Sequence, residues 1–159
     1  PLVYGPSALG NFRRLLAAIR AGLPLPFAGI RNRRAFVAIE NLVSFITLRL
    51  GRPEQSFEVF LIADNEQVST PEFARRIAKA CGGRAHLFPL PDSVLAMFFR
   101  LTGRSEFGDS LLGSMEIDIA KARRTGWEPK VALDEGLLHA VQGSPTTPRS
   151  RKSFQAAGQ

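Results

Sequence analysis

The sequence lacks the residues from which several kinds of site are built. Cys81 is its only cysteine, which excludes an intrachain disulfide and favours a reducing compartment. Its histidines, His86 and His139, are isolated from each other and from any cluster of cysteines or carboxylates, which argues against a metal site or a nucleophilic triad. No signal peptide and no membrane-spanning apolar run can be recognised. We therefore expect no metal, no membrane partner and a cytoplasmic location.

The residues that are present are typical of one globular domain followed by a tail. The chain has 159 residues, of which 45% are apolar and 22% charged, and its formal net charge is +7. A positive balance of this kind favours anionic ligands. Residues 143–159 are rich in Ser, Thr, Pro and basic side chains and show no periodicity, so we predict a disordered basic tail after a domain at residues 1–142.

Segments with strand and helix patterns alternate along the domain, which predicts an α/β fold with a few short parallel strands and about six helices. Strands are expected at Leu2–Tyr4, Ala35–Ile39, Phe57–Ala63 and His86–Phe88. Helices are expected between Phe12 and Gly22, from Asn41 to Leu50, from Ser69 to Gly82, from Asp92 or Ser93 to Leu101, from Asp118 to Arg124 and from Leu133 to Val141. Asn41 is expected to cap its helix, with Leu42, Phe45 and Ile46 on the buried side.

The most apolar of these strands, Phe57–Ala63, has the pattern of a parallel strand covered on both faces. So small an open sheet would leave one edge and one face uncovered. Together with an opening at Pro1 that reads as a strand already under way, this indicates that half of the fold is missing and that the chain is a fragment of something longer.

The order of the motifs identifies the kind of half that is present. They are PLVYGP, GNFRRLL, LPLP, RRAFVAIENLV, STPEFARRIAKA and DIAKARRTGWEPKVALDEGL, spread over residues 1–142. This order resembles the C-terminal half of an extended short-chain dehydrogenase/reductase, the family of NAD-dependent nucleotide-sugar epimerases, dehydratases and 4-keto-reductases. The resemblance implies a partial Rossmann-like fold and a role in binding the substrate.

The catalytic features of that family are absent from this chain. The family uses a Gly-rich dinucleotide turn and a Tyr-x-x-x-Lys pair, in which the lysine lowers the pKa of the tyrosine. No two glycines here are separated by a single residue, and the only tyrosine, Tyr4, is followed four positions later by Ala8. We therefore expect no catalytic residue in this chain, and NAD or NADP is expected on the missing N-terminal half, with none bound by this chain alone.

The resemblance gives one arginine of the stretch IRNRRAFVAIENL a role. In the family pattern R-D-[FY]-h-h-V-x-D, the leading arginine contacts the substrate diphosphate, and Arg34 holds that place with Phe36 as the aromatic residue. A guanidinium offers planar, forked donors that match phosphate oxygens. Ala35 replaces the usual aspartate and Asn41 stands where a second aspartate is usual. Arg31 and Arg33 are interpreted as a solvated basic turn.

Four further residues are candidates by the same resemblance. Asn11, at the start of a helix, is expected to help hold the diphosphate or to cap the helix, and both roles are compatible. Arg104 is a candidate second phosphate ligand. Tyr4 and Pro6 belong to the turn that lies under the nicotinamide in the family, where the tyrosine is more often structural than a ligand. Leu2 replaces an asparagine that commonly contacts substrate in the family, which argues against a standard epimerase. The form PLVYGP is more similar to the branch that includes bacterial 4-keto-reductases of acetamido sugars and poorly characterised epimerases.

Three functions stay open at this point. The first is the substrate-binding portion of an NAD(P)-dependent epimerase or 4-keto-reductase that acts on a nucleotide sugar, with UDP as the expected nucleotide. The second is a basic anion-binding or nucleic-acid-binding module, against which the absence of aromatic residues interleaved with the arginines argues, so that no nucleic-acid partner is expected. The third is a truncated fragment without independent activity.

Overall fold

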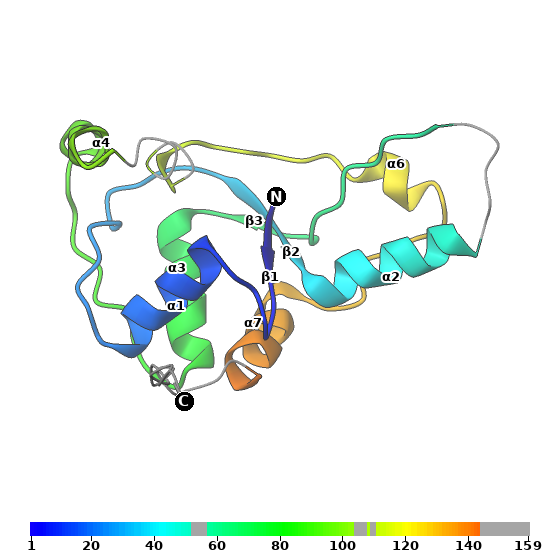
Figure 1. The fold of residues 1–159 in the computed structure, drawn as a ribbon, viewed down its shortest axis with the longest axis horizontal. Coiled ribbons are helices and arrows are strands. Elements are labelled where there is room, and N and C mark those ends of the chain that lie inside the picture. The colour runs from blue at the N-terminus through cyan, green and yellow to red at the C-terminus, as the bar shows by residue number, and fades with distance from the viewer. Residues whose placement is uncertain (52–56, 104–107, 109–110, 144–159) are drawn as a thin grey trace, which may run out of the picture.

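The computed structural model describes residues 1–51, 57–103, 108 and 111–143, which form helices around one small sheet (Figure 1). The strands are β1 (Leu2–Tyr4), β2 (Arg34–Ala38) and β3 (Gln67–Val68). The helices are α1 (Asn11–Arg20), α2 (Ile39–Leu50), α3 (Thr70–Ala80), α4 (Asp92–Leu101), α6 (Ala120–Arg123) and α7 (Leu133–Gln142). The expected α/β class with six helices in the described residues is confirmed.

The sheet is mixed, with strand order β1-β2-β3. β1 runs parallel to β2, with Leu2 opposite Phe36, whereas β3 is antiparallel to β2, with Val68 opposite Arg34. The prediction of parallel strands therefore holds for one pair of strands and is wrong for the other. The Asp64 amide bonds to the Phe36 carbonyl shortly before β3, so the chain already runs opposite to β2 when it enters β3.

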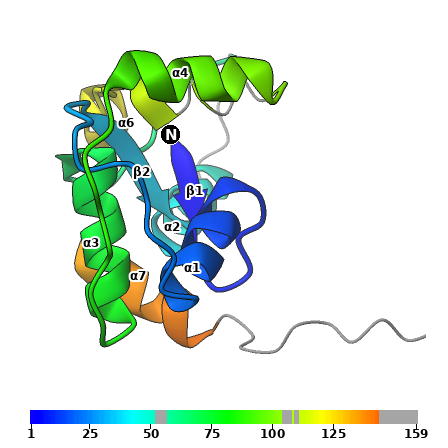
Figure 2. The ribbon, with the colours of Figure 1, turned by 90° about the vertical axis from the view of Figure 1, so that its left-hand side faces the viewer.

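All five residues of β2 are buried, and their alternation divides the interior into two cores. Phe36 and Ala38 point toward α1, α3 and α7, where the ring of Phe36 stacks on Phe73 with centroids 3.8 Å apart. Ala35 and Val37 point toward α2 and α6 on the other face. Figure 2 shows α1, α3 and α7 together, with α4 crossing above them. Arg34 lies on the same face of β2 as Phe36, so its side chain is directed toward α1 and α3.

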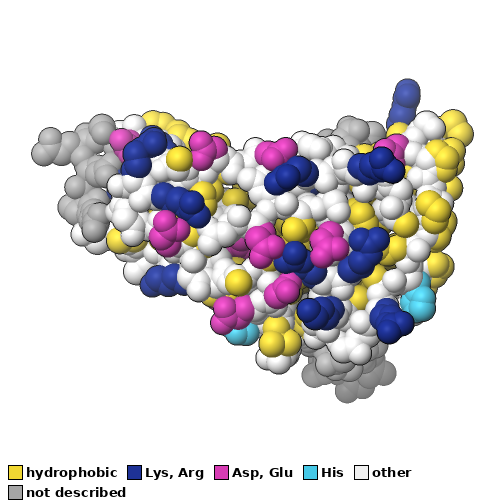
Figure 3. All heavy atoms as spheres, turned by 180° about the vertical axis from the view of Figure 1, so that it is seen from behind, with side chains coloured by type: hydrophobic (Ala, Val, Ile, Leu, Met, Phe, Trp, Pro, Cys, Tyr) yellow, Lys and Arg dark blue, Asp and Glu magenta, His cyan; other side chains and the backbone are white. Residues whose placement is uncertain are grey.

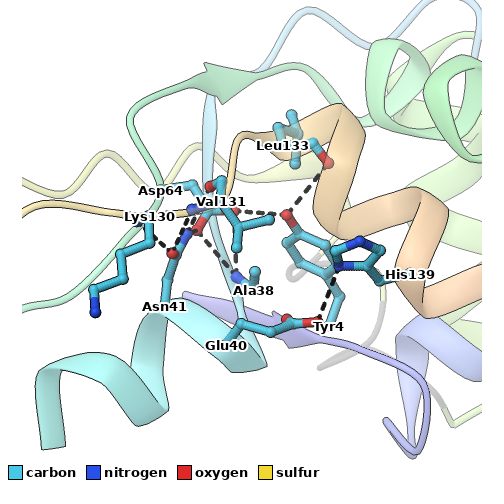
Figure 4. Close-up of polar contacts among 9 residues, drawn as sticks. All are labelled: Tyr4, Ala38, Glu40, Asn41, Asp64, Lys130, Val131, Leu133 and His139. Carbon is cyan, nitrogen blue, oxygen red and sulfur yellow. Dashed lines mark hydrogen bonds and ion pairs between the residues drawn. The ribbon is translucent and has the colours of Figure 1, made fainter. Parts of the chain in front are cut away.

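A buried polar network fixes the end of β2 (Figure 4). The Asp64 carboxylate accepts hydrogen bonds from the Ala38 amide at 3.0 Å, from the Asn41 side-chain amide at 2.7 Å and from the Tyr4 hydroxyl at 2.8 Å. Asn41 also donates to the Val131 carbonyl and accepts from the amides of residues 130 and 131. Burial raises the pKa of Asp64, and burial beside this carboxylate raises the pKa of Tyr4. The network joins β1, β2, α2 and the chain leading into α7.

Most predicted elements are confirmed, and Ser69 caps α3 by accepting from the Glu72 amide at 3.3 Å. The prediction that Asn41 caps a helix is wrong, because Asn41 lies inside α2, which begins two residues earlier after Ala38. The predicted burial of Ile46 is also wrong, since it is 47% exposed. Residues 86–88 form no strand but a single bridge, between Leu25 and Leu87.

The strongest predicted strand, residues 57–63, is not a strand in the structure. A strand is defined by its hydrogen-bonded neighbour, and the described residues give this segment none. Only the Asp64 amide, one residue further on, bonds back to the Phe36 carbonyl. None of the described helices is long and apolar enough to cross a membrane. The predicted tail, residues 143–159, lies outside the described residues apart from Gly143.

We predict that Asn41→Ala lowers the free energy of unfolding by about 2–4 kcal/mol, because it leaves several buried partners without hydrogen bonds. Urea denaturation followed by circular dichroism measures the change. Asn65→Ala is the matched control, since Asn65 is exposed and accepts one hydrogen bond, from Arg123. We expect the control to change stability by less than about 0.5 kcal/mol. Equal effects of the two substitutions would contradict a structural role for the network.

Candidate functional site

A cavity of about 230 Å³ lies between α1, the first half of β2 and the start of α3. Its wall is mainly apolar, formed by side chains of Leu2, Phe12, Leu15, Ala18, Leu25, Phe27, Phe36, Phe73 and Leu111. Its polar lining comes from Asn11, Arg14, Arg34 and Thr70. Two of the residues predicted to bind substrate, Arg34 and Asn11, thus line one cavity although they are far apart in the sequence.

Arg34 is the unusual member of this lining because it is a charge removed from water. Its residue is only 8% exposed, and burial lowers the pKa of its guanidinium. One Nη atom donates to the Gly113 carbonyl at 2.8 Å, and no carboxylate of the described residues lies within 4 Å to form an ion pair. A guanidinium has five N–H donors, and burying it without an acid costs several kcal/mol unless another anion compensates the charge.

Asn11 opens α1 at the cavity, and this end of the helix is suited to an anion. The residue before it, Gly10, has a φ of 73° and makes no side-chain cap, and no acidic residue lies in the first turn. The amide groups at a helix N-terminus carry a partial positive charge and can donate to an anion. Arg14, one turn further along, lines the same cavity. Three sources of positive potential therefore surround one space.

Asn32 joins the chain segments around Arg34 by hydrogen bonds, and it was not predicted from the sequence. Its side-chain amide donates to the Thr70 hydroxyl and to the carbonyls of Leu111 and Gly113, and its oxygen accepts from the Thr70 amide at 2.9 Å. The Gly113 carbonyl that receives Arg34 is fixed by the same side chain. One feature of the sequence could have indicated this role: an asparagine, whose side chain often bonds to backbone groups, stands between two arginines.

Arg31 and Arg33 are exposed, which confirms their interpretation as a solvated turn. Arg33 pairs with Glu116 at 3.3 Å on the surface. Arg104, the third predicted phosphate ligand, lies outside the described residues. The first two arginines of the stretch therefore face solvent, and the third, Arg34, enters the interior with β2.

Tyr4 and Pro6, the two residues predicted to contact the cofactor, are both packed against other parts of this chain. The Tyr4 ring is fully buried, and its hydroxyl donates to Asp64. Pro6 is half-buried beside Gly143, where a side chain on the glycine would collide with the proline ring. Their contact with a nicotinamide stays a prediction. Within the described residues there is no group of three histidine, cysteine or acidic side chains that could hold a metal ion.

Comparison with known proteins gives one type of relative. No protein-family model matches the chain. It is 36% identical over 143 residues to a UDP-glucose 4-epimerase of Vibrio cholerae, a match that covers 89% of this chain and 44% of that protein. The chain therefore spans less than half the length of the curated relative that it matches.

Solved structures share the fold. The human epimerase family protein SDR39U1, solved with NADPH, superimposes with a TM-score of 0.71 at 22% identity, over 89% of this chain and 46% of that one. A UDP-glucuronic acid 4-epimerase from Bacillus cereus, in complex with NAD, gives a TM-score of 0.63 at 21% identity, over 89% of this chain and 41% of that one. In sequence and in fold, the chain matches the C-terminal part of the NAD-dependent epimerases of the short-chain dehydrogenase/reductase family.

Proposed function

We propose that this chain is the substrate-binding portion of an NAD(P)-dependent nucleotide-sugar epimerase or 4-keto-reductase, and that its cavity holds the diphosphate of a UDP-sugar. The observation that carries the proposal is Arg34, a guanidinium that lines the cavity, is 8% exposed and has no acidic partner among the described residues. A buried cation of this kind is most simply explained by an anionic ligand that completes its hydrogen bonds.

The rest of the lining favours a diphosphate ester over a small inorganic ion. Arg34 supplies forked donors, and Asn11 with the start of α1 supplies amide donors on another wall. The larger part of the cavity is apolar and suits the faces of a base or a sugar ring rather than water. The relative from Vibrio cholerae is named for its action on UDP-glucose, and we extend that substrate class to this chain as a proposal.

We assign to this chain the binding and orientation of the substrate, and we assign the hydride transfer to the N-terminal half of the fold. NAD or NADP would supply hydride transfer with a ring carbon of the sugar. The residues of this chain do not by themselves suit a dinucleotide, because no G-x-G turn is present and the Tyr4 hydroxyl is engaged by Asp64. We assign the cofactor and the catalytic Tyr-Lys pair to the N-terminal half of the fold. Rigid anchoring of the diphosphate would then present C4 of the sugar to that half.

The charges on the surface favour this proposal over a nucleic-acid-binding module. Figure 3 shows acidic and basic side chains interspersed on the face opposite to that of Figure 1. Arg76 alone contacts Glu72, Glu66 and Asp134 at 2.9–3.3 Å. On this face, positive charge that is neutralised in this way offers a poor track for a phosphate backbone.

We predict that Arg34→Met leaves the unliganded protein about as stable as the wild type, within about 1 kcal/mol, because an apolar side chain replaces a buried unpaired charge. Asn32→Ala, which removes the hydrogen bonds to Thr70 and Leu111, should lower the free energy of unfolding by about 2–3 kcal/mol because these buried partners lose their hydrogen bonds. Urea denaturation without ligand compares the two variants. A loss at Arg34→Met as large as that at Asn32→Ala would show that Arg34 serves the fold instead of a ligand.

We predict that UDP binds the chain and raises its melting temperature, since a ligand at about 100 times its Kd adds about 2.7 kcal/mol of stability. Arg34→Met should weaken UDP binding about 10–100-fold, through the loss of charge-assisted hydrogen bonds worth about 1.5–3 kcal/mol. Isothermal titration calorimetry measures both proteins. Arg33→Met is the matched control and should bind as the wild type does. Steeply salt-dependent binding of single-stranded RNA, without binding of UDP, would contradict the proposal.

A further inference from the structure

Helix α4 carries exposed apolar residues beside its buried ones. Leu95 and Phe99 form its buried side and pack on Phe27 and Ile30 in a small core of their own. A helix on the surface of a globular protein normally has charged or polar residues on its solvent side. On α4, four apolar side chains at helical spacing are instead 43–80% exposed, and we call them the outer face: Val94, Met97, Phe98 and Leu101.

The chain next to α4 continues this apolar surface. Two extended segments, residues 25–28 and 86–88, lie side by side and are joined by backbone hydrogen bonds of 2.8–3.2 Å. Leu87 packs on the core beneath α4, whereas its neighbour Phe88 is 42% exposed. Figure 2 faces this end of the molecule, with α4 across the top of both segments. The exposed apolar area therefore extends beyond the helix itself.

The same end of the molecule is basic. We define the α4 end as residues 20–33 and 84–103, which contain five arginines and a single acidic residue. Arg31, Arg84 and Arg100 are exposed there and form no ion pair within the described residues. Figure 3 shows hydrophobic and basic side chains along its right-hand edge, which is this end, whereas most acidic side chains lie nearer the middle. The exposed apolar residues are thus accompanied by positive charge that no nearby acid compensates.

We propose that the α4 end is a surface for peripheral contact with an anionic lipid membrane. The outer face enters the boundary between headgroups and acyl chains, and the arginines beside it contact lipid phosphates. Helices that lie in this boundary combine large apolar residues on one side with basic residues next to them. No membrane partner was expected from the sequence because no segment is long enough to span a bilayer, but a helix that lies in the interface does not need that length. The inference does not depend on the proposed function.

Charge and shape favour a lipid surface over other partners. A second copy of the chain would bring two basic α4 ends together, and their like charges would repel each other. A nucleic acid would match the arginines but would leave the outer face in contact with a polar backbone. α4 lies at the edge of the molecule in Figures 1 and 2, and an exposed helix of this kind suits a fluid interface that adapts to it.

The α4 end lies next to the cavity. Phe27 belongs to the core beneath α4 and also lines the cavity, and Leu111 packs on that core and lines the cavity as well. A chain bound through α4 would therefore hold its cavity close to the lipid headgroups. The residues of the outer face do not line the cavity, so their substitution tests membrane contact without altering the proposed UDP site.

Co-sedimentation of the chain with phosphatidylcholine vesicles that contain about 30% phosphatidylserine tests the proposal. We expect these vesicles to bind about tenfold more tightly than vesicles of phosphatidylcholine alone, and added salt should weaken the binding. Amide exchange at residues 94–101 should slow about tenfold on the vesicles, because the helix enters the interface.

Two variants remove the two components of the surface. Met97→Asp should weaken vesicle binding about tenfold, and so should the double variant Arg31→Glu with Arg84→Glu. Ile46→Asp is the control for the first, since Ile46 is an exposed apolar residue on α2. Arg124→Glu is the control for the second, since Arg124 is exposed at the end of α6. Both controls should bind as the wild type does, and circular dichroism verifies that every variant is folded.

Several results would overturn the inference. One is the absence of binding to phosphatidylserine vesicles at low salt, and another is an equal loss of binding from Met97→Asp and Ile46→Asp. Binding that is independent of lipid charge would remove the role of the arginines. A dimer of the chain alone that Met97→Asp dissociates would show that a second copy covers the outer face. Binding of single-stranded RNA through Arg31 and Arg84, without binding of vesicles, would assign the surface to a nucleic acid instead.

Discussion

A guanidinium kept out of water without an acid beside it is the one constraint on which the proposed function depends. Arg34 is 8% exposed and bonds only to the Gly113 carbonyl among the described residues. Fold stability alone gives no reason to keep this charge, because an apolar residue of similar size would fill the wall at lower cost. A cavity lies directly beside it, with the start of α1 on another wall. The charge of Arg34, the cavity and the amide donors at the start of α1 therefore lie together, and an anionic ligand would account for all three.

The fold supplies the rigidity that such a site needs. β2 is buried on both faces between two cores, so the strand that carries Arg34 has little freedom to move. Asn32 holds the Gly113 carbonyl from one side, and Asp64 with Asn41 fixes the other end of β2. Site and scaffold thus share the same strand.

The features that could be predicted from sequence were local ones. Amphipathic periodicity located α1 and α3, a hydroxyl cap with a following proline marked the start of α3, and the family pattern separated Arg34 from its exposed neighbours. The predictions that failed depend on contacts between segments that are far apart in the sequence. Asn41 has the residue type of a cap, but its partners, the backbone at residues 130 and 131, are far away in the sequence. Residues 57–63 have the sequence of a buried strand, yet no neighbouring strand is present in the described part of the chain.

The central claim, that Arg34 is the anion-binding group, is tested most directly by nuclear magnetic resonance of the arginine Nε–Hε groups during titration with UDP. Assignment of the Arg34 signal comes from its disappearance in Arg34→Lys. The account predicts that this signal shifts and that its exchange with solvent slows as UDP is added, while the signals of Arg31 and Arg33 stay in place. An unchanged Arg34 signal with shifts at Arg31 and Arg33 would place the anion on the surface turn and contradict the account.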